Sequence, residues 1–454
     1  MKLGPALSRF AVVTATLFFG FTGASSAAPE SDFLDASFGT AGHVFPRSTT
    51  EKGVAALAED TRGGVLIAND YFEVERRLQD GSIDPAFGDS NGVAHAFQSP
   101  WDEELEAMVV QKNGKIVLGG YGRVGLGPDR ISMVLVRLNA NGSPDRTFGE
   151  DGAVTSPARS LEDGAKVLRD LTVDDRGRIL VVGHSSDRNG LLMRFTPTGK
   201  VDQSFGRDGK RIVRGRKARS MTALTSIDLT ESGRIFVAGE KNGQSLIARY
   251  KSNGRPDRSF NRDGKTFGPS GPRSRCFSLD EFCSNSIVEA MPGGGALMSA
   301  QTPRPSSELG YSLFLKWKKH GDRDRDFQGD GFVRLTGSRV QKALGDSGRI
   351  KGGTATYGFE SRPDGSVFVL QGINLKSGGP AMLGMLIDPA SNEYLPAPSG
   401  EPYFLAAEGD HPYTGKVAST EYGQTLIGGW RSAPGYEGVQ YDVRSAVYRV
   451  GLDG

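Results

Sequence analysis

The sequence predicts an all-β protein, a single seven-bladed β-propeller with four antiparallel strands in each blade. Two recurring segments lead to this prediction. A glycine hairpin appears seven times, and 360 residues over six intervals separate its first and last copies, a mean period of 60. An Asp-x-x-Phe segment recurs six times at a similar spacing. Because no stretch shows sustained helical spacing, a helical solenoid is not expected.

The hairpin unit consists of a turn glycine followed by an apolar run, as in NGKIVLGG and RGRILVVG. Short glycine turns between apolar runs are typical of β-hairpins. We therefore expect each copy to join the first two strands of a blade. The seven turn glycines are Gly63, Gly114, Gly177, Gly233, Gly294, Gly365 and Gly423.

The second unit places an Asp three residues before a Phe, and in the last five copies a turn glycine and a basic residue precede the Asp. We expect the Phe side chains to fill the core between strands or blades. The Asp side chains should cap turns, and Arg–Asp pairing within a blade is possible. The pairs are Asp35/Phe38, Asp84/Phe87, Asp145/Phe148, Asp202/Phe205, Asp257/Phe260 and Asp324/Phe327.

The two ends of the sequence complement each other. The last repeat reaches Arg449 and Gly454 but lacks the Asp-x-x-Phe segment and fourth strand, which FLDASFGTAGHV supplies near the N-terminus. We therefore expect an N-terminal strand to close the last blade, with residues 33–45 paired to 444–451. Such closure removes the open sheet edges that favour aggregation.

These repeats resemble the delta-60 repeat proteins, a bacterial family, over nearly all of residues 29–454. The Asp-x-x-Phe-Gly segments and the Gly-Lys/Arg-Ile hairpins carry the resemblance. It implies an extracellular propeller-like protein built from about seven repeats of ~60 residues. The resemblance implies no particular activity.

Residues 1–28 are predicted to be a signal peptide that is removed before folding. Lys2 and Arg9 precede an apolar run of about 14 residues, which is shorter than the ~20 residues of a membrane-spanning helix. Small residues then allow cleavage near Ala27 or Ala28. We expect a secreted protein, extracellular or periplasmic, without membrane insertion.

The net charge and the cysteine count of the sequence bear on its partners and on disulfide formation. The net charge of +2, from 55 basic and 53 acidic residues, gives no electrostatic reason to expect nucleic-acid binding. The two cysteines, Cys276 and Cys283, are predicted to form a disulfide in an exported chain. The alternative, a metal site, would need further ligands nearby. We expect a monomer.

No motif in the sequence requires catalysis, and the Gly120–Gly125 match to a dinucleotide fingerprint lacks the helix that would follow it. We predict no catalytic residues, no cofactor and no metal site. The leading hypothesis is a non-catalytic binding or scaffold protein for an extracellular glycan, peptide or protein. Its alternative is an extracellular propeller enzyme, a glycan hydrolase or lyase, with perturbed carboxylates or histidines at the channel mouth.

The position of the ligand site is predicted from loop lengths. Naming the strands of a blade A to D in chain order, the A–B and C–D turns should share one face, and the B–C loops and D–A crossovers the other. Long segments fall on the second face, where binding loops usually lie. Aromatic and imidazole side chains gather there as candidate ligand-binding residues: Trp101, Tyr403, His411, Tyr413, Trp430, Tyr436 and Tyr441.

Overall fold

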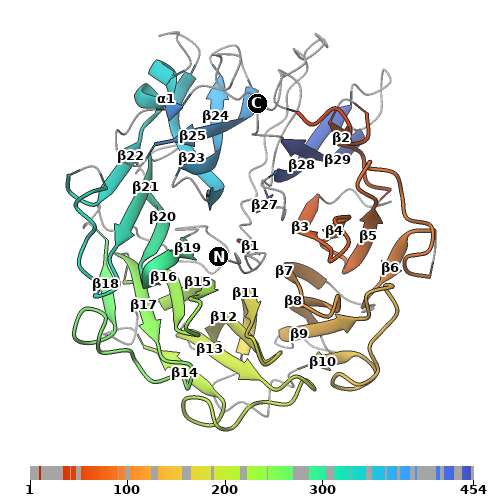
Figure 1. The fold of residues 1–454 in the computed structure, drawn as a ribbon, viewed down its shortest axis with the longest axis horizontal. Helices are drawn as coiled ribbons and strands as arrows, with labels where there is room; N and C mark the ends of the chain where they lie inside the picture. Colours follow the sequence, from red (N-terminus) through yellow and green to blue (C-terminus); the bar gives the residue numbers. More distant parts are fainter. Residues whose placement is uncertain are drawn as a thin grey trace, which may run out of the picture.

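The computed structural model is a ring of seven antiparallel sheets arranged around a central axis (Figure 1). The first strand of each blade lies innermost and the last lies at the rim. This architecture confirms the predicted seven-bladed propeller. The structure describes residues 10–11, 34–40, 42–47, 53–89, 91–97, 103–123, 131–155, 165–185, 189–214, 222–242, 244–268, 286–302, 311–327, 329–343, 350–362, 366–375, 379–388, 394–395, 416–419, 424–433 and 442–450.

The first four blades each contain four consecutive strands. Blade 1 comprises β3 (Val54–Glu59), β4 (Val65–Asn69), β5 (Glu73–Arg77) and β6 (Val93–His95). Blade 2 comprises β7 (Glu103–Val110), β8 (Ile116–Arg123), β9 (Ile131–Leu138) and β10 (Ala153–Thr155). Blade 3 comprises β11 (Ala165–Val173), β12 (Ile179–Ser185), β13 (Gly190–Phe195) and β14 (Lys210–Val213). Blade 4 comprises β15 (Thr222–Leu229), β16 (Ile235–Lys241), β17 (Gln244–Tyr250) and β18 (Lys265–Phe267).

The remaining blades follow the same plan, with the last one completed from the N-terminal region. Blade 5 comprises β19 (Ile287–Ala290), β20 (Ala296–Thr302), β21 (Tyr311–Trp317) and β22 (Phe332–Leu335), with η1 (Pro292–Gly294) in its first turn. Blade 6 comprises β23 (Ile350–Ser361), β24 (Val367–Leu375), β25 (Gly379–Ile387) and β26 (Tyr394–Leu395). Blade 7 comprises β27 (Lys416–Ser419), β28 (Thr425–Ala433), β29 (Asp442–Val450) and β2 (His43–Val44).

The N-terminal strand closes the ring as the sequence predicts. In β2, His43 pairs with Tyr448 and Val44 with Val447 of β29. The amide of Asp35 donates to the carbonyl of Arg449 at 2.9 Å, beside this short ladder. Residues more than 400 positions apart in the sequence thus form one sheet, and the last blade has no open outer edge along the paired residues.

Two short elements stand outside this plan. Strand β1 (Phe10–Ala11) pairs with β27 at the inner side of blade 7, and it belongs to the predicted signal peptide. Helix α1 (Gly337–Ala343) lies in the crossover between blades 5 and 6 (Figure 1). Within the described residues, no helix has the length and apolar character needed to cross a bilayer.

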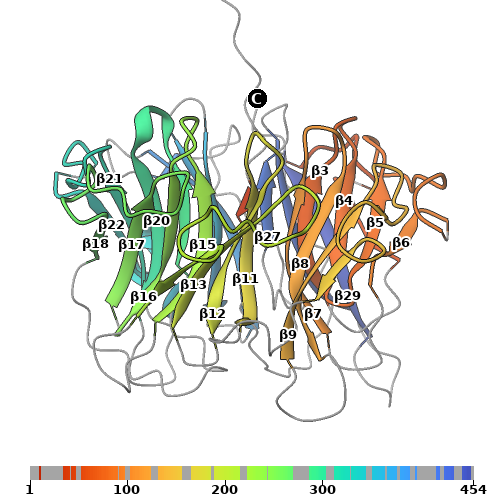
Figure 2. The ribbon, with the colours of Figure 1, turned by 90° about the horizontal axis from the view of Figure 1, so that it is seen from below.

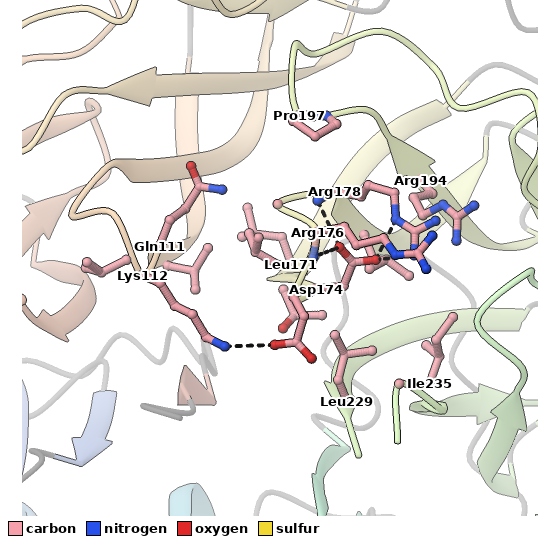
Figure 3. A pocket seen from close by; sticks show the side chains of 18 of the residues that line it. Gln111, Lys112, Leu171, Asp174, Arg176, Arg178, Arg194, Pro197, Leu229 and Ile235 are labelled. Carbon is pink, nitrogen blue, oxygen red and sulfur yellow. Dashed lines mark hydrogen bonds and ion pairs between the residues drawn. The ribbon is translucent and has the colours of Figure 1, made fainter. Parts of the chain in front are cut away.

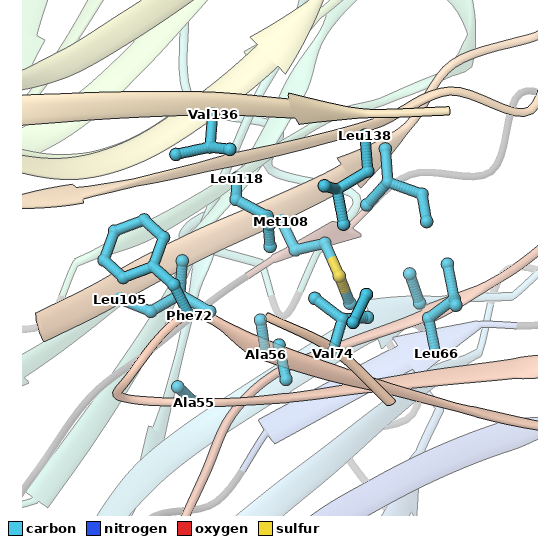
Figure 4. Close-up of a cluster of buried hydrophobic side chains, with 14 of the residues drawn as sticks. Ala55, Ala56, Leu66, Phe72, Val74, Leu105, Met108, Leu118, Val136 and Leu138 are labelled. Carbon is cyan, nitrogen blue, oxygen red and sulfur yellow. The ribbon is translucent and has the colours of Figure 1, made fainter. Parts of the chain in front are cut away.

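The apolar core lies between neighbouring blades. Between blades 1 and 2, Phe72 and Val74 face Leu105, Met108 and Leu118, and all five side chains are buried (Figure 4). Alternate residues of each strand point to opposite faces of a blade. Each blade therefore contributes to two such clusters and depends on both neighbours for its core.

The recurring Arg, Asp and Phe residues form a clamp between blades. In blade 2, Arg137 donates from Nε to Asp145 Oδ2 at 2.6 Å and from Nη1 to the carbonyl of Pro197 in blade 3 at 2.5 Å. Its guanidinium lies 4.6 Å from the ring centre of Phe148, which is fully buried. The predicted pairing within blades is thus confirmed, and the same side chain also holds the next blade. Equivalent ion pairs join Arg76 to Asp84, Arg194 to Asp202, Arg249 to Asp257 and Arg449 to Asp35.

Glycines allow the backbones of neighbouring blades to meet beside each clamp. The amide of Gly149 donates to the carbonyl of Thr198 in the next blade at 2.9 Å. Gly199, which follows in that turn, has a φ of +84°, and a Cβ atom there would lie only 3.0 Å from the Gly149 nitrogen. A glycine is therefore required both by the left-handed backbone and by the close approach.

We expect Arg194→Met to lower the free energy of unfolding by about 3 kcal/mol, because it leaves Asp202 largely buried without its partner. The Arg194 Nε–Asp202 Oδ2 distance is 2.8 Å, and the two side chains are 3% and 13% exposed. Urea unfolding of the variant measures the change. Arg207→Met is the control, since Arg207 is 94% exposed, and it should change stability by less than about 0.5 kcal/mol. Equal effects of the two substitutions would contradict a role for the clamp.

Candidate functional site

The turns between strands divide into two kinds that lie on opposite faces of the disc (Figure 2). One cavity is lined by A–B turns together with the C–D turn residues Pro197 and Asn253. These two kinds of turn therefore share a face, as the antiparallel order of the strands predicts. We call it the turn face.

The cavity in the turn face lies where the inner strands of blades 1–4 end, and we call it the turn-face cavity (Figure 3). Its volume is 1450 Å³. Apolar side chains at the ends of the inner strands form part of its wall, among them Val109, Leu171 and Leu229. Polar residues of the A–B turns, including Gln111, Lys112 and Asp175, surround them.

Ion pairs join several charged side chains around the cavity. Lys112 of blade 2 reaches Asp175 of blade 3 at 2.9 Å, and both side chains are exposed (Figure 3). Arg178 lies 2.6 Å from Asp174 within the blade 3 turn. The first pair is solvated and contributes little stability, whereas the side chains of the second are only 20% and 13% exposed. The two pairs leave no strong field of one sign to select a ligand by charge alone.

One polar atom in the wall of the cavity lacks a partner. Gln111 begins the A–B turn of blade 2 and is 8% exposed, and its Oε1 atom accepts no hydrogen bond from the described residues. Its Nε2 atom lies 3.8 Å from the position of a Cβ built on Gly177 in blade 3. A buried carbonyl oxygen without a donor is costly, so this atom is a candidate acceptor for a ligand or water.

Carboxylates on the inner strands bond to backbone amides of the following blade. Asp170 accepts the amide of Ile227 at 2.8 Å, and Asp228 accepts that of Ala290 at 2.7 Å. Burial raises the pKa of Asp170 to about 8. Desolvation, with Asp228 and Glu360 nearby, likewise raises the pKa of Glu289 to about 8.

These perturbed carboxylates are the feature by which a propeller enzyme could be recognised, but their hydrogen bonds indicate a structural use. Glu289 accepts the amide of Ser361 in blade 6 at 2.9 Å. Asp170 also accepts the amide of Leu171 at 2.8 Å. Each carboxylate therefore joins two blades, and its raised pKa follows from burial in the joint.

A second titratable group joins blades 2 and 3. Register shifts in β7 and β11 place Glu106 and Arg169 at β-bulges, and Arg169 Nη1 lies 2.6 Å from Glu106 Oε1. Bulges change the direction in which a side chain points. His184 lies near this pair, and burial, with the positive charge of Arg169, lowers its pKa to about 4. A neutral, buried His184 and a closed ion pair give this group a structural role.

The aromatic residues predicted from the sequence are not brought together by the described parts of the structure. Trp430 lies on β28, but its side chain is outside the described residues. The predicted site therefore stays a prediction. The other six candidates, which also lie outside the described residues, are Trp101, Tyr403, His411, Tyr413, Tyr436 and Tyr441.

The predicted disulfide stays a prediction as well, since Cys276 and Cys283 lie outside the described residues. Among the residues that the structure describes, no three His, Cys, Asp or Glu side chains gather closely enough to bind a metal ion.

Sequence analysis missed the carboxylates that join the blades, although a sequence signal for them exists. Asp228, Glu289 and Glu360 are each the penultimate residue of an inner strand. Aligning the repeats on their A–B turns places an acidic residue at this position in blades 4–6 and an uncharged residue in blades 1–3. Only the structure reveals what those acids bind.

Comparison with protein families gives one match, to a β-propeller family described as a domain of unknown function, DUF5122. It covers residues 111–148, 177–205 and 231–260. These segments contain the hairpins and Asp-x-x-Phe units of blades 2–4, which supports a β-propeller repeat family. No curated protein matches the chain.

Solved structures that resemble this chain are propellers of low sequence identity. The β-propeller domain of Cps50 (Swd1) from Myceliophteria thermophila is 8% identical, with 89% of this chain and 99% of that chain covered and a TM-score of 0.49. The WD40 repeats of RRP9 are also 8% identical, with 92% and 98% covered and a TM-score of 0.46.

Proposed function

We propose that this chain is an exported, non-catalytic binding protein that holds an extended peptide in the turn-face cavity. The volume of this cavity, 1450 Å³, carries the proposal. Cavities for small molecules usually measure about 300–1,000 Å³. A longer ligand that spans several blades fits this larger space better.

The chemistry of the cavity wall supports binding rather than catalysis. Its apolar floor and its polar rim provide both burial and hydrogen bonds, as recognition sites do. The nearby carboxylates with raised pKa values, Asp170 and Glu289, have amide donors from neighbouring blades. Carboxylates do line the cavity, but those of Asp174 and Asp175 are paired with neighbouring basic side chains. The alternative, an extracellular glycan hydrolase or lyase, would need carboxylates free to act on a substrate.

Screening the mature protein, residues 29–454, against a random peptide library and a glycan array tests this function. We expect peptides to be selected, and Val173→Trp to weaken binding of the strongest peptide by about tenfold or more, because the indole fills space beside the cavity floor. Lys319→Trp is the control, since Lys319 is exposed in a blade 5 turn outside the cavity. Selection of glycans alone, or equal affinity of both variants, would contradict the proposal.

A further inference from the structure

The last amide of an inner strand points away from strand B of its own blade. In blade 2, Gln111 N donates to Lys115 O at 2.8 Å, and in blade 3, Asp174 N donates to Arg178 O at 3.0 Å. Hydrogen-bonded and non-bonded pairs alternate along an antiparallel ladder. The amides one residue earlier, those of Val110 and Val173, therefore point away from strand B of their own blade.

In blades 5 and 6 the corresponding amides are held by carboxylates. Ala290 N donates to Asp228 Oδ2 at 2.7 Å, and Ser361 N donates to Glu289 Oε2 at 2.9 Å. Each acceptor is the penultimate residue of the inner strand in the preceding blade. In these two blades, the amide that points away from strand B at the end of the inner strand therefore donates to a carboxylate. That carboxylate comes from the same strand position of the preceding blade each time.

Blades 1 and 2 lack the acceptor at this position. Their penultimate inner-strand residues are Ala58 and Val109, whose side chains cannot accept a hydrogen bond. The amides of Val110 and Val173 point away from strand B, and among the described residues they donate to no turn or loop carbonyl; both residues line the turn-face cavity. These two amides therefore lack the carboxylate that holds their counterparts in blades 5 and 6.

We infer that the turn-face cavity is specific for acidic peptides, whose carboxylates bind the amides of Val110 and Val173. The inference rests on the proposed function and adds the class of ligand. Charge-assisted bonds from amides to carboxylates are stronger than those to neutral acceptors. The unpaired Oε1 atom of Gln111, buried in the same wall, accepts a backbone amide of the peptide beside them.

Two labelled ten-residue peptides test the inference, one of alternating Glu and Gly and the other of alternating Gln and Gly. We expect fluorescence anisotropy to give about tenfold tighter binding of the Glu peptide to the mature protein. Hydrogen exchange at the amides of Val110 and Val173 should slow with the Glu peptide only. Equal affinity of the two peptides overturns the acidic specificity, whereas the proposed function survives if the library peptides still bind.

Substitution of Val109 tests the same site from the protein side. Val109→Asp places a carboxylate where Asp228 stands in blade 4, so it should occupy the amide of Val173. We expect the Asp variant to bind the Glu peptide about tenfold more weakly than Val109→Asn does. Unchanged Glu-peptide affinity in a folded Asp variant overturns the inference. If that variant does not fold, the wild-type exchange data decide alone, and no slowing at the two amides overturns it.

Discussion

Deletion of residues 29–45 is expected to prevent ring closure and to leave the protein unfolded or aggregated. The segment carries Phe38, which is fully buried, and Val44, which pairs with β29. Loss of a buried Phe side chain alone costs about 3–5 kcal/mol. The deletion also removes Asp35, whose Oδ2 atom lies 2.9 Å from Nη2 of Arg449 in the intact protein. Together these losses approach the free energy of unfolding of a typical domain, which is roughly 5–15 kcal/mol.

A circular permutant separates loss of the strand from loss of its position in the chain. Arg137 and Asp145 are eight residues apart, and joining Gly454 directly to Phe33 gives Arg449 and Asp35 the same spacing. A chain that starts at residue 48 and ends with residues 33–47 should therefore fold like the wild type. Thermal unfolding measures the stability of the deletion variant and of the permutant, and light scattering shows whether each is monomeric. A stable, monomeric deletion variant, or a permutant as unstable as the deletion, would contradict the closing role of this strand.

The ring was predictable from the sequence because its main contacts recur in most of the repeats. The Asp-x-x-Phe unit marks the clamp in blades 1–4 and 7, where an Arg–Asp pair lies beside a buried Phe such as Phe148. The missing unit after Arg449 and its presence at Asp35 predict closure in the same way. Repetition makes such contacts visible because the same physical requirement recurs about every 60 residues.

The turn-face cavity could not be predicted in this way, because the inner-strand position that distinguishes it differs from blade to blade and does not belong to the repeated units. Ala58 and Val109 are ordinary residues for a strand, and nothing in them marks a site. Their meaning depends on Asp228 and Glu289, whose carboxylates cross to the next blade. A contact between blades involves residues about 60 positions apart, and short-range patterns do not contain it.

The lengths of the loops predict a ligand site on the face opposite the turn face, and the prediction has a physical reason. Long loops often carry binding residues, while short glycine turns such as that of Gly177 were expected to be structural. The turn-face cavity nevertheless lies among these short turns, since the ends of the inner strands leave space between them. Loop length therefore located neither Gln111 nor the amides of Val110 and Val173.

The free energy of unfolding is expected to fall as the pH rises from about 5.5 to about 8.5. Burial raises the pKa of Asp170 to about 8, compared with an ordinary value of 3.8. The native state therefore holds a proton over a range in which the unfolded chain has released it. Stability from this group is fully present below the unfolded pKa and is lost as pH rises through the folded pKa. The slope has an upper limit of roughly 1.4 kcal/mol per pH unit for one such group.

Asp170→Asn should remove the share of this pH dependence that comes from blade 3, because the amide is neutral throughout the range and still offers one oxygen to Ile227 or Leu171. Urea unfolding at several pH values measures the slope for each variant. Glu289, whose pKa is also raised to about 8, should preserve part of the slope until Glu289→Gln is added. Asp175→Asn is the control, since this side chain is 65% exposed and should leave the slope unchanged. A wild-type stability that is constant over this range, or a slope that Asp170→Asn does not reduce, would show that the Asp170 carboxyl is ionised in the folded protein and held by its amide donors.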